Sequence, residues 1–290
     1  MSGAGQGGPG RPGGDGKPPT RFPLPLARVG QAAAAATGAA RAREPLRPQR
    51  HLHEAARDAS RLSAPQGLGL DSAGVRERMV QRLRAEGIRC EPVFAAMAEV
   101  PRHAFVDTAL AIQAYEDTSL PIGHGQTISK PSVVARMVEL LFDGATARAG
   151  GHLGRVLEIG TGCGYQTALL ARLARHVVSI ERLRPLFDKA QANLAALPGG
   201  RPDPVRLVYG DGMLGHPPNA PYDSVIAAAG GEELPDAWLE QLAVGGRLVA
   251  PMHRGGGRGQ VLVVIDRHAH GCQRTEHEAV HFVPLKSGIV

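Results

Sequence analysis

The amino-acid sequence predicts an α/β protein with a doubly wound, seven-stranded, mostly parallel sheet that carries helices on both faces. From residue 155 onward, short apolar runs alternate with patterns of helical period, as expected for consecutive strand–helix units. The first apolar run leads directly into a turn with glycine at every second position, and then into a helix. In open parallel sheets, ligands bind beyond the carboxyl ends of the strands, so this turn marks the expected site.

The N-terminal seventy residues differ from the rest in composition and charge. Residues 1–70 hold ten Lys or Arg and four Asp or Glu, which accounts for the whole net charge of +6. They are rich in Gly, Pro, Ala and Arg and poor in large apolar side chains, so we predict a disordered basic extension before a folded domain at 71–290. A solvated extension or an overlong start of the reading frame is favoured over an organelle transit peptide or an arm that binds nucleic acid.

The apolar runs and the cysteines indicate the compartment. No apolar stretch reaches the ~18 residues of a membrane span, and the N-terminus lacks the apolar core of a secretory signal. Cys90, Cys163 and Cys272 are too few and too widely spaced for a disulfide framework. We therefore expect a cytoplasmic protein that does not contact a membrane, and we expect a monomer.

The segment before the alternating region predicts helices and one structured loop. Apolar side chains at helical spacing predict an amphipathic helix over 72–88, and a second helix follows at 91–100. The run LPIGHGQTIS at 120–129 is rich in turn residues and shows no clear period, so we expect a structured loop. It leads into a helix over 131–141 that begins with a proline.

The alternating region predicts seven strands and three long helical patterns. The expected strands are RVLEI (155–159), HVVSIE (176–181), VRLVYGDG (205–212), YDSVIAAA (222–229), GGRLVAPM (245–252), QVLVVIDR (260–267) and TEHEAVHFVPL (275–285). The expected helices are GYQTALLARLA (164–174), LRPLFDKAQANLAAL (183–197) and DAWLEQLA (236–243). Strands that alternate with helices in this way form parallel sheets.

The glycine spacing distinguishes between two kinds of nucleotide-binding turn. Gly160, Gly162 and Gly164 form a G-x-G-x-G pattern, whereas the dinucleotide fingerprint G-x-G-x-x-G would place its third glycine at Tyr165. The tighter pattern, after the acidic strand end at Glu158, resembles the turn of class I S-adenosylmethionine-dependent methyltransferases, which have a Rossmann-like sheet. The resemblance implies S-adenosyl-L-methionine as the cofactor, and methyl transfer rather than hydride transfer.

Acidic residues at the strand ends complete the expected cofactor site. Glu181 ends the second strand, where its carboxylate can accept hydrogen bonds from two ribose hydroxyls. Gly210 and Asp211 end the third strand, in place to meet the adenine amino group, and Glu158 would lie under the sulfonium or amino-acid end. Each feature alone could be a helix cap or a turn, but their order and spacing together favour a methyl-donor site.

Four segments make the resemblance more specific. Similarity to the protein-L-isoaspartate (D-aspartate) O-methyltransferase family is found in GHGQTIS (123–129), VPRHAFVD (100–107), AYEDTSLPIG (114–123) and HFVPL (281–285). It runs from about residue 71 to the last residue and leaves out the N-terminal extension. The resemblance implies a repair enzyme that methylates the α-carboxylate of L-isoaspartyl residues in age-damaged proteins and peptides. The ester then closes to a succinimide, and hydrolysis restores some aspartate.

The implied chemistry depends mainly on positioning. A carboxylate of pKa about 4 is already ionised at pH 7, so its attack on the sulfonium methyl needs no general base. The resemblance places the catalytic hydroxyl on Ser129 and the substrate-binding loop on Thr127, Ile128 and Ser129. A helix cap is the alternative role for Ser129. Lys130 and Ser132 stand where a neutral residue and often an aromatic one are expected.

Other chemistries have less support in the sequence. The nucleophile-elbow pattern G-x-S-x-G is absent, and the run RHAHGCQRTEHEAVH (267–281) matches no standard zinc spacing. We interpret that run as the turn between the last two strands, and we expect no metal. Two alternatives stay open. One is a methyltransferase of the same fold that acts on another carboxylate or a small molecule, and the other is a catalytically silent cofactor-binding module whose tail docks on nucleic acid.

Overall fold

The computed structural model describes residues 73–254 and 259–290, and every structural statement below refers to these residues. The chain divides into two units between Ser63 and Ala64, and the described residues belong to the second unit. The predicted disordered extension at 1–70 lies outside the described residues.

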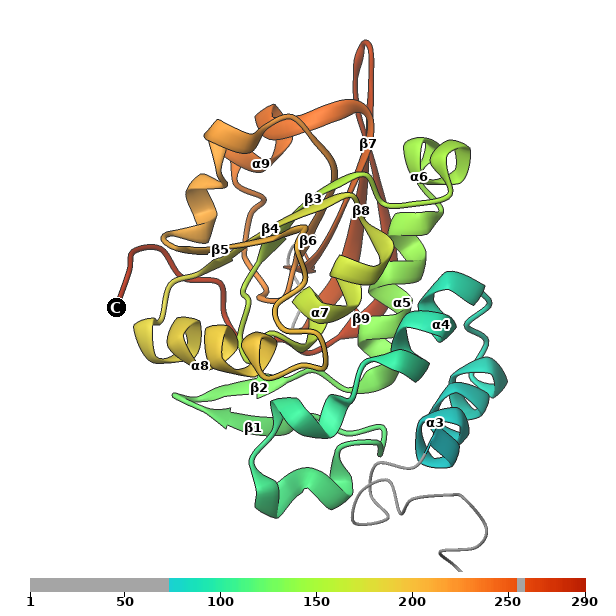
Figure 1. Ribbon diagram of the computed structural model, residues 1–290. Coiled ribbons are helices and arrows are strands. Elements are labelled where there is room, and N and C mark those ends of the chain that lie inside the picture. Colours follow the sequence, from blue (N-terminus) through green and yellow to red (C-terminus); the bar gives the residue numbers. More distant parts are fainter. Residues whose placement is uncertain (1–72, 255–258) are drawn as a thin grey trace, which may run out of the picture. The chain divides into compact units, whose positions relative to one another are not determined.

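A seven-stranded sheet with the order β5-β4-β3-β6-β7-β8-β9 forms the centre of this unit (Figure 1). Its strands are β3 (Arg155–Ile159), β4 (His176–Glu181), β5 (Val205–Tyr209), β6 (Tyr222–Ala227), β7 (Leu242–His253), β8 (Gln260–His268) and β9 (Gly271–Val280). The five strands from β5 to β7 in that order pair in parallel, and β8 and β9 add antiparallel pairs at one side. The predicted doubly wound, mostly parallel sheet is confirmed.

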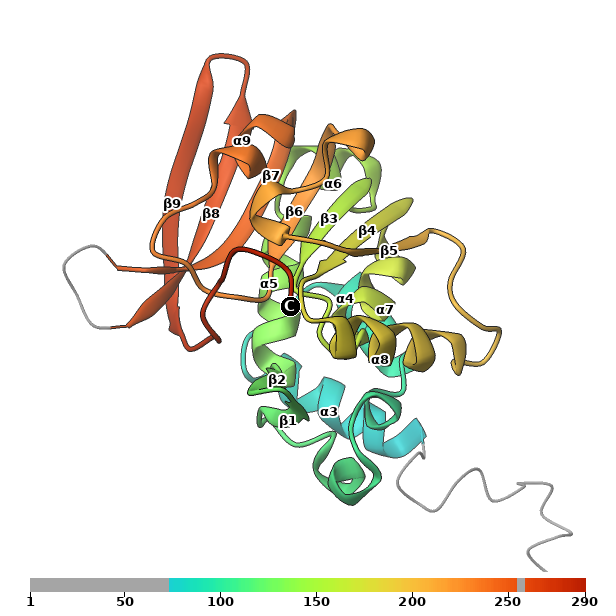
Figure 2. The same ribbon diagram turned by 90° about the vertical axis from the view of Figure 1, so that its left-hand side faces the viewer.

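Helices cover both faces of the sheet (Figure 2). They are α3 (Ala73–Ala85), α4 (Glu91–Glu99), α5 (Pro131–Phe142), α6 (Ala145–Gly150), α7 (Tyr165–Leu173), α8 (Arg184–Ala195) and α9 (Asp236–Gln241). On one face, Leu169 of α7 and Leu194 of α8 belong to the larger hydrophobic core, and on the other face Trp238 of α9 belongs to a second core. Val156 and Leu157 of β3 contribute to one core each, because successive strand side chains point to opposite faces.

The N-terminal helices lie beside the sheet and lead toward the segment 120–129, which the sequence predicted to be a structured loop. The predicted helices at 72–88 and 91–100 are present as α3 and α4, which pack on each other, and α4 also packs on α7. Two short 3-10 helices, η2 (Arg102–Phe105) and η3 (Thr108–Gln113), then connect α4 to the next element.

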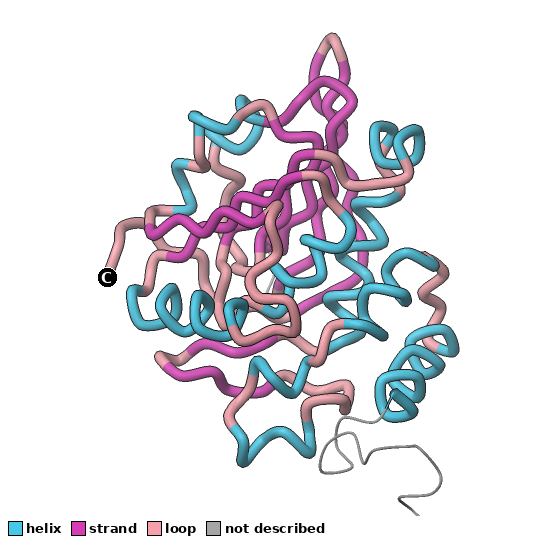
Figure 3. Tube along the Cα trace, viewed as in Figure 1, coloured by secondary structure: helices cyan, strands magenta, loops and turns pink. Residues whose placement is uncertain are grey.

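The segment predicted as a loop forms a β-hairpin that lies apart from the main sheet (Figure 3). Strands β1 (Leu120–Gly123) and β2 (Gln126–Ile128) pair antiparallel, with Leu120 opposite Ile128, and both of these side chains are buried. The two strands have only four and three residues, so they are too short for an alternating apolar–polar pattern to be recognised in the sequence. This hairpin leads directly into α5.

The last predicted strand requires correction at both ends. β9 starts at Gly271 rather than at residue 275, and it ends at Val280, because its partner β8 pairs with it from His268 back to Gln260. The run 267–281, predicted as a turn, is therefore mostly strand, and the turn itself is Ala269 and His270. HFVPL lies beyond β9, and its Pro284 forms an isolated parallel bridge with Gly230.

Candidate active site

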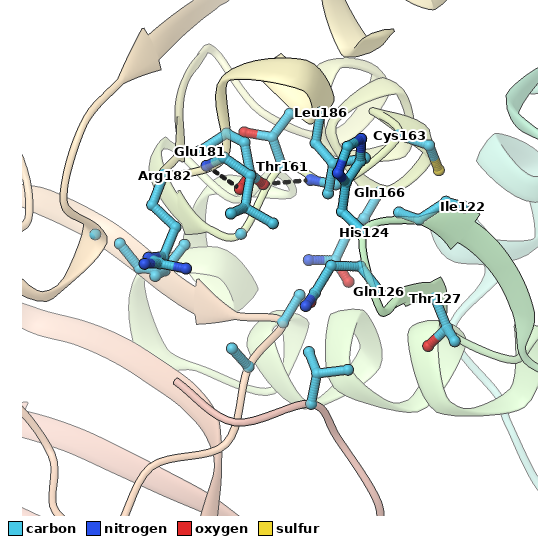
Figure 4. A pocket seen from close by; sticks show the side chains of 18 of the residues that line it. Ile122, His124, Gln126, Thr127, Thr161, Cys163, Gln166, Glu181, Arg182 and Leu186 are labelled. Atoms are coloured by element: carbon cyan, nitrogen blue, oxygen red, sulfur yellow. Dashed lines mark hydrogen bonds between the residues drawn. The ribbon is translucent and has the colours of Figure 1, made fainter. Parts of the chain in front are cut away.

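A pocket of about 350 Å³ lies at the carboxyl ends of β3 and β4. Its walls come mainly from three regions: the glycine turn after β3 with the neighbouring end of β4 and start of α8, the β1–β2 hairpin, and the C-terminal segment 283–290. Figure 4 shows Thr161 and Glu181 on one side of this space, with Gln126 and Thr127 of the hairpin across from them. The pocket therefore lies at the edge of the sheet where the sequence predicted a ligand site.

The three glycines of the predicted turn all have left-handed backbone. The angle φ is +89° at Gly160, +58° at Gly162 and +92° at Gly164, values that favour glycine because it has no Cβ. Gly160 and Gly162 line the pocket, and Gly164 is the N-cap residue of α7. A Cβ on Gly162 would stand 3.3 Å from Cδ1 of Ile122, so the turn and the hairpin approach each other closely.

Glu181 lines the pocket, as predicted. Its side chain is buried, and its carboxylate accepts hydrogen bonds from the backbone N–H groups of Gly162 and Leu183, each at 2.9 Å. An ionised carboxylate has about four acceptor positions, so about two remain for hydroxyl groups of a ligand. The same hydrogen bonds tie the glycine turn to the end of β4.

Glu158, which the sequence placed under the sulfonium or amino-acid end, is not among the residues that line the pocket. Sheet register is the reason, because Glu158 pairs with Ser179 and Glu181 lies two residues farther toward the carboxyl edge. The Glu158 carboxylate is fully buried and accepts hydrogen bonds from Gln166 Nε2 at 3.0 Å and Thr167 Oγ1 at 2.5 Å. It thereby holds the first turn of α7, while Gln166, which the sequence did not single out, lines the pocket.

A pH dependence of stability follows from this carboxyl. Burial raises the pKa of Glu158 to about 7, and the charge of nearby Glu181 acts in the same direction. Because this value lies above the ordinary 4.5, the folded state holds the proton more tightly than the unfolded state does. The contribution of Glu158 to the free energy of unfolding is therefore fully present below pH 4.5 and falls as the pH rises to about 7.

We expect Glu158→Gln to flatten the pH dependence of unfolding, since an amide does not titrate. Urea unfolding at several pH values between about 4.5 and 7 measures this, with the wild type losing more stability than the variant as the pH rises. Equal slopes for the two proteins would contradict the prediction.

Gly210 and Asp211 lie just beyond β5, which ends at Tyr209 and not at residue 212, and neither is among the residues that line the pocket, whereas Gly212 is. One oxygen of the Asp211 carboxylate accepts hydrogen bonds from Ser287 Oγ at 2.8 Å and from the Gly288 N–H at 2.6 Å. The other oxygen accepts from the Met213 N–H at 2.9 Å, which is the local cap that the sequence left open, whereas no local pattern signals the contacts with the C-terminal segment. A contact between Asp211 and adenine stays a prediction.

The hairpin side of the pocket contains the predicted acceptor residues. Thr127, Ile128 and Ser129 all line the pocket. His124 and Gln126 line it as well, although the predicted site did not include them (Figure 4). His124 has a φ of +54°, the sole positive value at a non-glycine residue within 73–254 and 259–290, and such backbone is often found at functional loops. Five residues of the GHGQTIS segment, rather than its last three alone, therefore form this wall.

The structure does not support Ser129 as a helix cap. Lys130 is the N-cap residue of α5, and its side chain makes no capping hydrogen bond. Asp117 supplies the cap from an earlier segment, because its carboxylate accepts hydrogen bonds from the Ser132 N–H and hydroxyl, both at 2.8 Å. Lys130 Nζ also lies 3.3 Å from Asp117. Lys130 and Ser132, the two residues that depart from the family pattern, thus both contact Asp117.

The C-terminal segment forms the third wall. Val283, Pro284 and Leu285 line the pocket, and Phe282 is buried in the larger core. Two backbone hydrogen bonds to Gly230, just beyond β6, hold the segment in place: the Leu285 N–H donates to the Gly230 carbonyl oxygen, and the Gly230 N–H donates to that of Val283. HFVPL therefore contributes to the site and not to the last strand.

The remaining candidates of the sequence lie elsewhere. The His and Cys side chains of the run 267–281 are spread along β8, the turn, β9 and the residue after it. In the part of the chain that the structure describes, no three His, Cys, Asp or Glu side chains gather so that they could hold a metal ion. No helix among the described residues combines the length and apolar character that a membrane crossing requires.

The chain is similar in sequence to known proteins over most of its length. Residues 74–289 match the family model of protein-L-isoaspartate(D-aspartate) O-methyltransferases. The protein-L-isoaspartate O-methyltransferase of Methylibium petroleiphilum is 63% identical over 273 residues, which cover 94% of this chain and 97% of the relative. The one of Leptothrix cholodnii is 59% identical, with 92% and 94% covered. The 273-residue match is longer than 71–290, so similarity reaches into the N-terminal region, where the sequence suggested none.

Solved structures share the fold. One protein-L-isoaspartate O-methyltransferase superposes with a TM-score of 0.63 at 27% identity, covering 74% of this chain and 67% of the other. A Plasmodium falciparum β-aspartate methyltransferase, solved with S-adenosyl-L-homocysteine, gives a TM-score of 0.62 at 23% identity and covers 73% of this chain and 98% of its own. The family model and the two bacterial relatives establish that the chain belongs to the protein-L-isoaspartate (D-aspartate) O-methyltransferase family.

Proposed function

We propose that this protein transfers a methyl group from S-adenosyl-L-methionine to the α-carboxylate of L-isoaspartyl residues in damaged proteins and peptides. The methyl ester closes to a succinimide, and hydrolysis of the succinimide restores aspartate. The observation that carries the proposal is a single pocket in which the glycine turn and Glu181 share the space with Ser129 and its hairpin. A part suited to the methyl donor and a part suited to the acceptor thus meet in one cavity.

The residues on the donor side fit S-adenosyl-L-methionine. Glu181 keeps acceptor positions for two ribose hydroxyls, and Gly160 and Gly162 expose backbone where a Cβ would stand. Ile180 and Leu186 add apolar surface that suits a flat base. When bound, the cofactor supplies a methyl group on a cationic sulfonium.

The acceptor side positions a nucleophile that is already active. The α-carboxylate is ionised at neutral pH, so no side chain has to remove a proton. The Ser129 hydroxyl donates a hydrogen bond to one carboxylate oxygen and leaves the other oxygen free for in-line attack. A neutral donor suits this role, because it orients the carboxylate without the strong ion pairing that would lower its reactivity.

Ser129→Ala is expected to lower kcat/KM for an isoaspartyl peptide roughly 10- to 100-fold, the worth of one hydrogen bond to a charged group. The measurement is transfer of labelled methyl from S-adenosyl-L-methionine to two peptides that differ only in isoaspartate or aspartate. The wild type should label the isoaspartyl peptide alone. Thr118→Ala removes an exposed hydroxyl from the preceding segment and serves as the control with unchanged kcat/KM.

Two results would count against this assignment. Labelling of neither peptide by a wild type that binds S-adenosyl-L-homocysteine would favour another carboxylate or a small molecule as the acceptor. A Ser129→Ala variant with the wild-type kcat/KM would remove Ser129 from the mechanism while leaving the reaction in place.

The same proposal includes a monomer that works in the cytoplasm without a metal. Cys90, Cys163 and Cys272 are free thiols, as a reducing compartment favours. Light scattering after gel filtration measures the mass in solution, and the mass of two chains would overturn the monomer.

A further inference from the structure

Arg102 is a buried cation that the proposed chemistry does not use. It begins η2, within the segment VPRHAFVD, and its side chain is 0% exposed. Its Nε donates a hydrogen bond to the carbonyl oxygen of Ala114, and its Nη2 donates one to the carbonyl oxygen of Ser129, both at 2.7 Å. The buried guanidinium is therefore hydrogen-bonded to the backbone of Ser129, the residue proposed to bind the substrate carboxylate.

Among the described residues Arg102 belongs to no ion pair, although the negative charge of Asp117 acts on it. Within 73–254 and 259–290, its hydrogen-bond partners are two carbonyl oxygens, and its Nη1 is buried without a partner. Burial lowers the pKa of Arg102, as expected for a cation removed from water. Moving a charge into the interior without an ion pair is costly, and the two hydrogen bonds to carbonyl oxygens offset part of this cost. The bond to Ser129 connects Arg102 to the acceptor side of the pocket.

The second contact of Arg102 is on the donor side of the pocket. Its guanidinium carbon lies 4.9 Å from the ring centre of Tyr165, the first residue of α7, directly after the glycine turn. The Tyr165 ring lines the pocket and packs edge-on against Phe105 of the same 3-10 helix, with 5.6 Å between ring centres. Arg102 thus contacts the acceptor loop through Ser129 and the donor turn through Tyr165.

We propose that Arg102 is a positioning residue for methyl transfer, which fixes the backbone of Ser129 relative to the start of α7. This inference rests on the proposed function, because the distance it sets is the one between the acceptor carboxylate and the methyl donor. In-line displacement is sensitive to that distance, and a misplacement of about 1 Å can reduce a rate roughly 100-fold. The effect of Arg102 on the reaction therefore passes through Ser129.

A double-mutant cycle tests this route, with wild type, Arg102→Lys, Ser129→Ala and the double variant assayed on the isoaspartyl peptide. Lysine keeps the charge but cannot hold two carbonyl oxygens in the planar geometry of a guanidinium. Arg102→Lys is expected to lower kcat roughly 10-fold or more in the wild-type background and by less than about 3-fold when Ser129 is already Ala. The affinity for S-adenosyl-L-homocysteine, measured by calorimetry, should change less than about 3-fold.

Two further variants separate positioning from folding. Arg267→Lys is the matched control, because Arg267 also donates hydrogen bonds to carbonyl oxygens but does not line the pocket. Its acceptors are the carbonyl oxygens of Leu239, Glu240 and Leu242. It should lower the melting temperature and leave kcat unchanged. If Arg102→Lys does not fold, Arg102→Gln replaces it in the same cycle, since a neutral side chain is easier to bury.

Each outcome of the double-mutant cycle either supports or overturns the proposed role of Arg102. An unchanged kcat in the Arg102 variant overturns the proposal, as does an equal loss of kcat in both backgrounds, which would mean that Arg102 acts independently of Ser129. The wild-type reaction with the isoaspartyl peptide establishes the proposed function in the same assay, so these results count against Arg102 alone. A wild type that labels neither peptide would overturn both.

Discussion

Glu181→Gln is expected to raise the dissociation constant for S-adenosyl-L-homocysteine by roughly 100-fold or more, because hydrogen bonds to a charged group are worth about 1.5–3 kcal/mol each. The carboxylate accepts from the N–H groups of Gly162 and Leu183 with both of its oxygens. A glutamine has one oxygen, so its amide nitrogen would face one of these N–H groups, donor against donor. The glycine turn would lose its anchor to β4 and the ribose would lose an acceptor.

Calorimetric titration of S-adenosyl-L-homocysteine measures the change, and Glu139→Gln is the matched control. It makes the same chemical replacement at a buried carboxylate of α5 that accepts hydrogen bonds from the backbone N–H groups of Arg89 and Cys90 and does not line the pocket. We expect its dissociation constant to stay within about 3-fold of the wild type. Equal losses in both variants would mean that the effect comes from the fold, and no loss at Glu181 would exclude it from the cofactor site.

Gly162→Val is expected to reduce methyl transfer at least ~100-fold, since displacement of reacting groups by about 1 Å is sufficient for such a loss. A valine at a φ of +58° is strained, because the left-handed region costs about 1–2 kcal/mol for residues with a Cβ. In addition, the Cβ would stand 3.3 Å from Ile122 Cδ1, and the two further methyl groups would press on the hairpin or fill the pocket. Strain and displacement act on the same turn.

Gly151→Val separates these two effects. Gly151 has a similar φ of +70°, and a Cβ there would meet nothing within 4 Å. We expect this variant to lose stability through strain, as a lower melting temperature, while kcat/KM for the isoaspartyl peptide stays within about 3-fold of the wild type. If both variants lose activity equally, strain alone explains the result. If Gly162→Val retains activity, the turn and the hairpin do not need their close approach.

The local pattern of the sequence was sufficient for most elements of the sheet. Strands such as β3 and β4 are short apolar runs bounded by glycine or charge, and the helices between them repeat with helical period, so local physics identifies both. The turn at Gly160 and Gly162 could also be predicted, because positive φ selects glycine whatever surrounds it. Elements defined mainly by pairing were harder. β9 is exposed along most of its length, so its bounds depend on hydrogen bonds to β8.

The sequence by itself determined the fold class, the glycine turn, Glu181 and the GHGQTIS segment, because these depend on local period, on backbone conformation and on position at a strand end. Only the tertiary structure decided which carboxylates face the pocket. Glu158 lies behind the turn because of its register with β4, and Asp211 is held by Ser287 and Gly288. The role of Arg102 has the same origin, since its partner Ser129 is 27 residues away. Register and long-range contacts are set by packing between distant segments, and no local pattern records them.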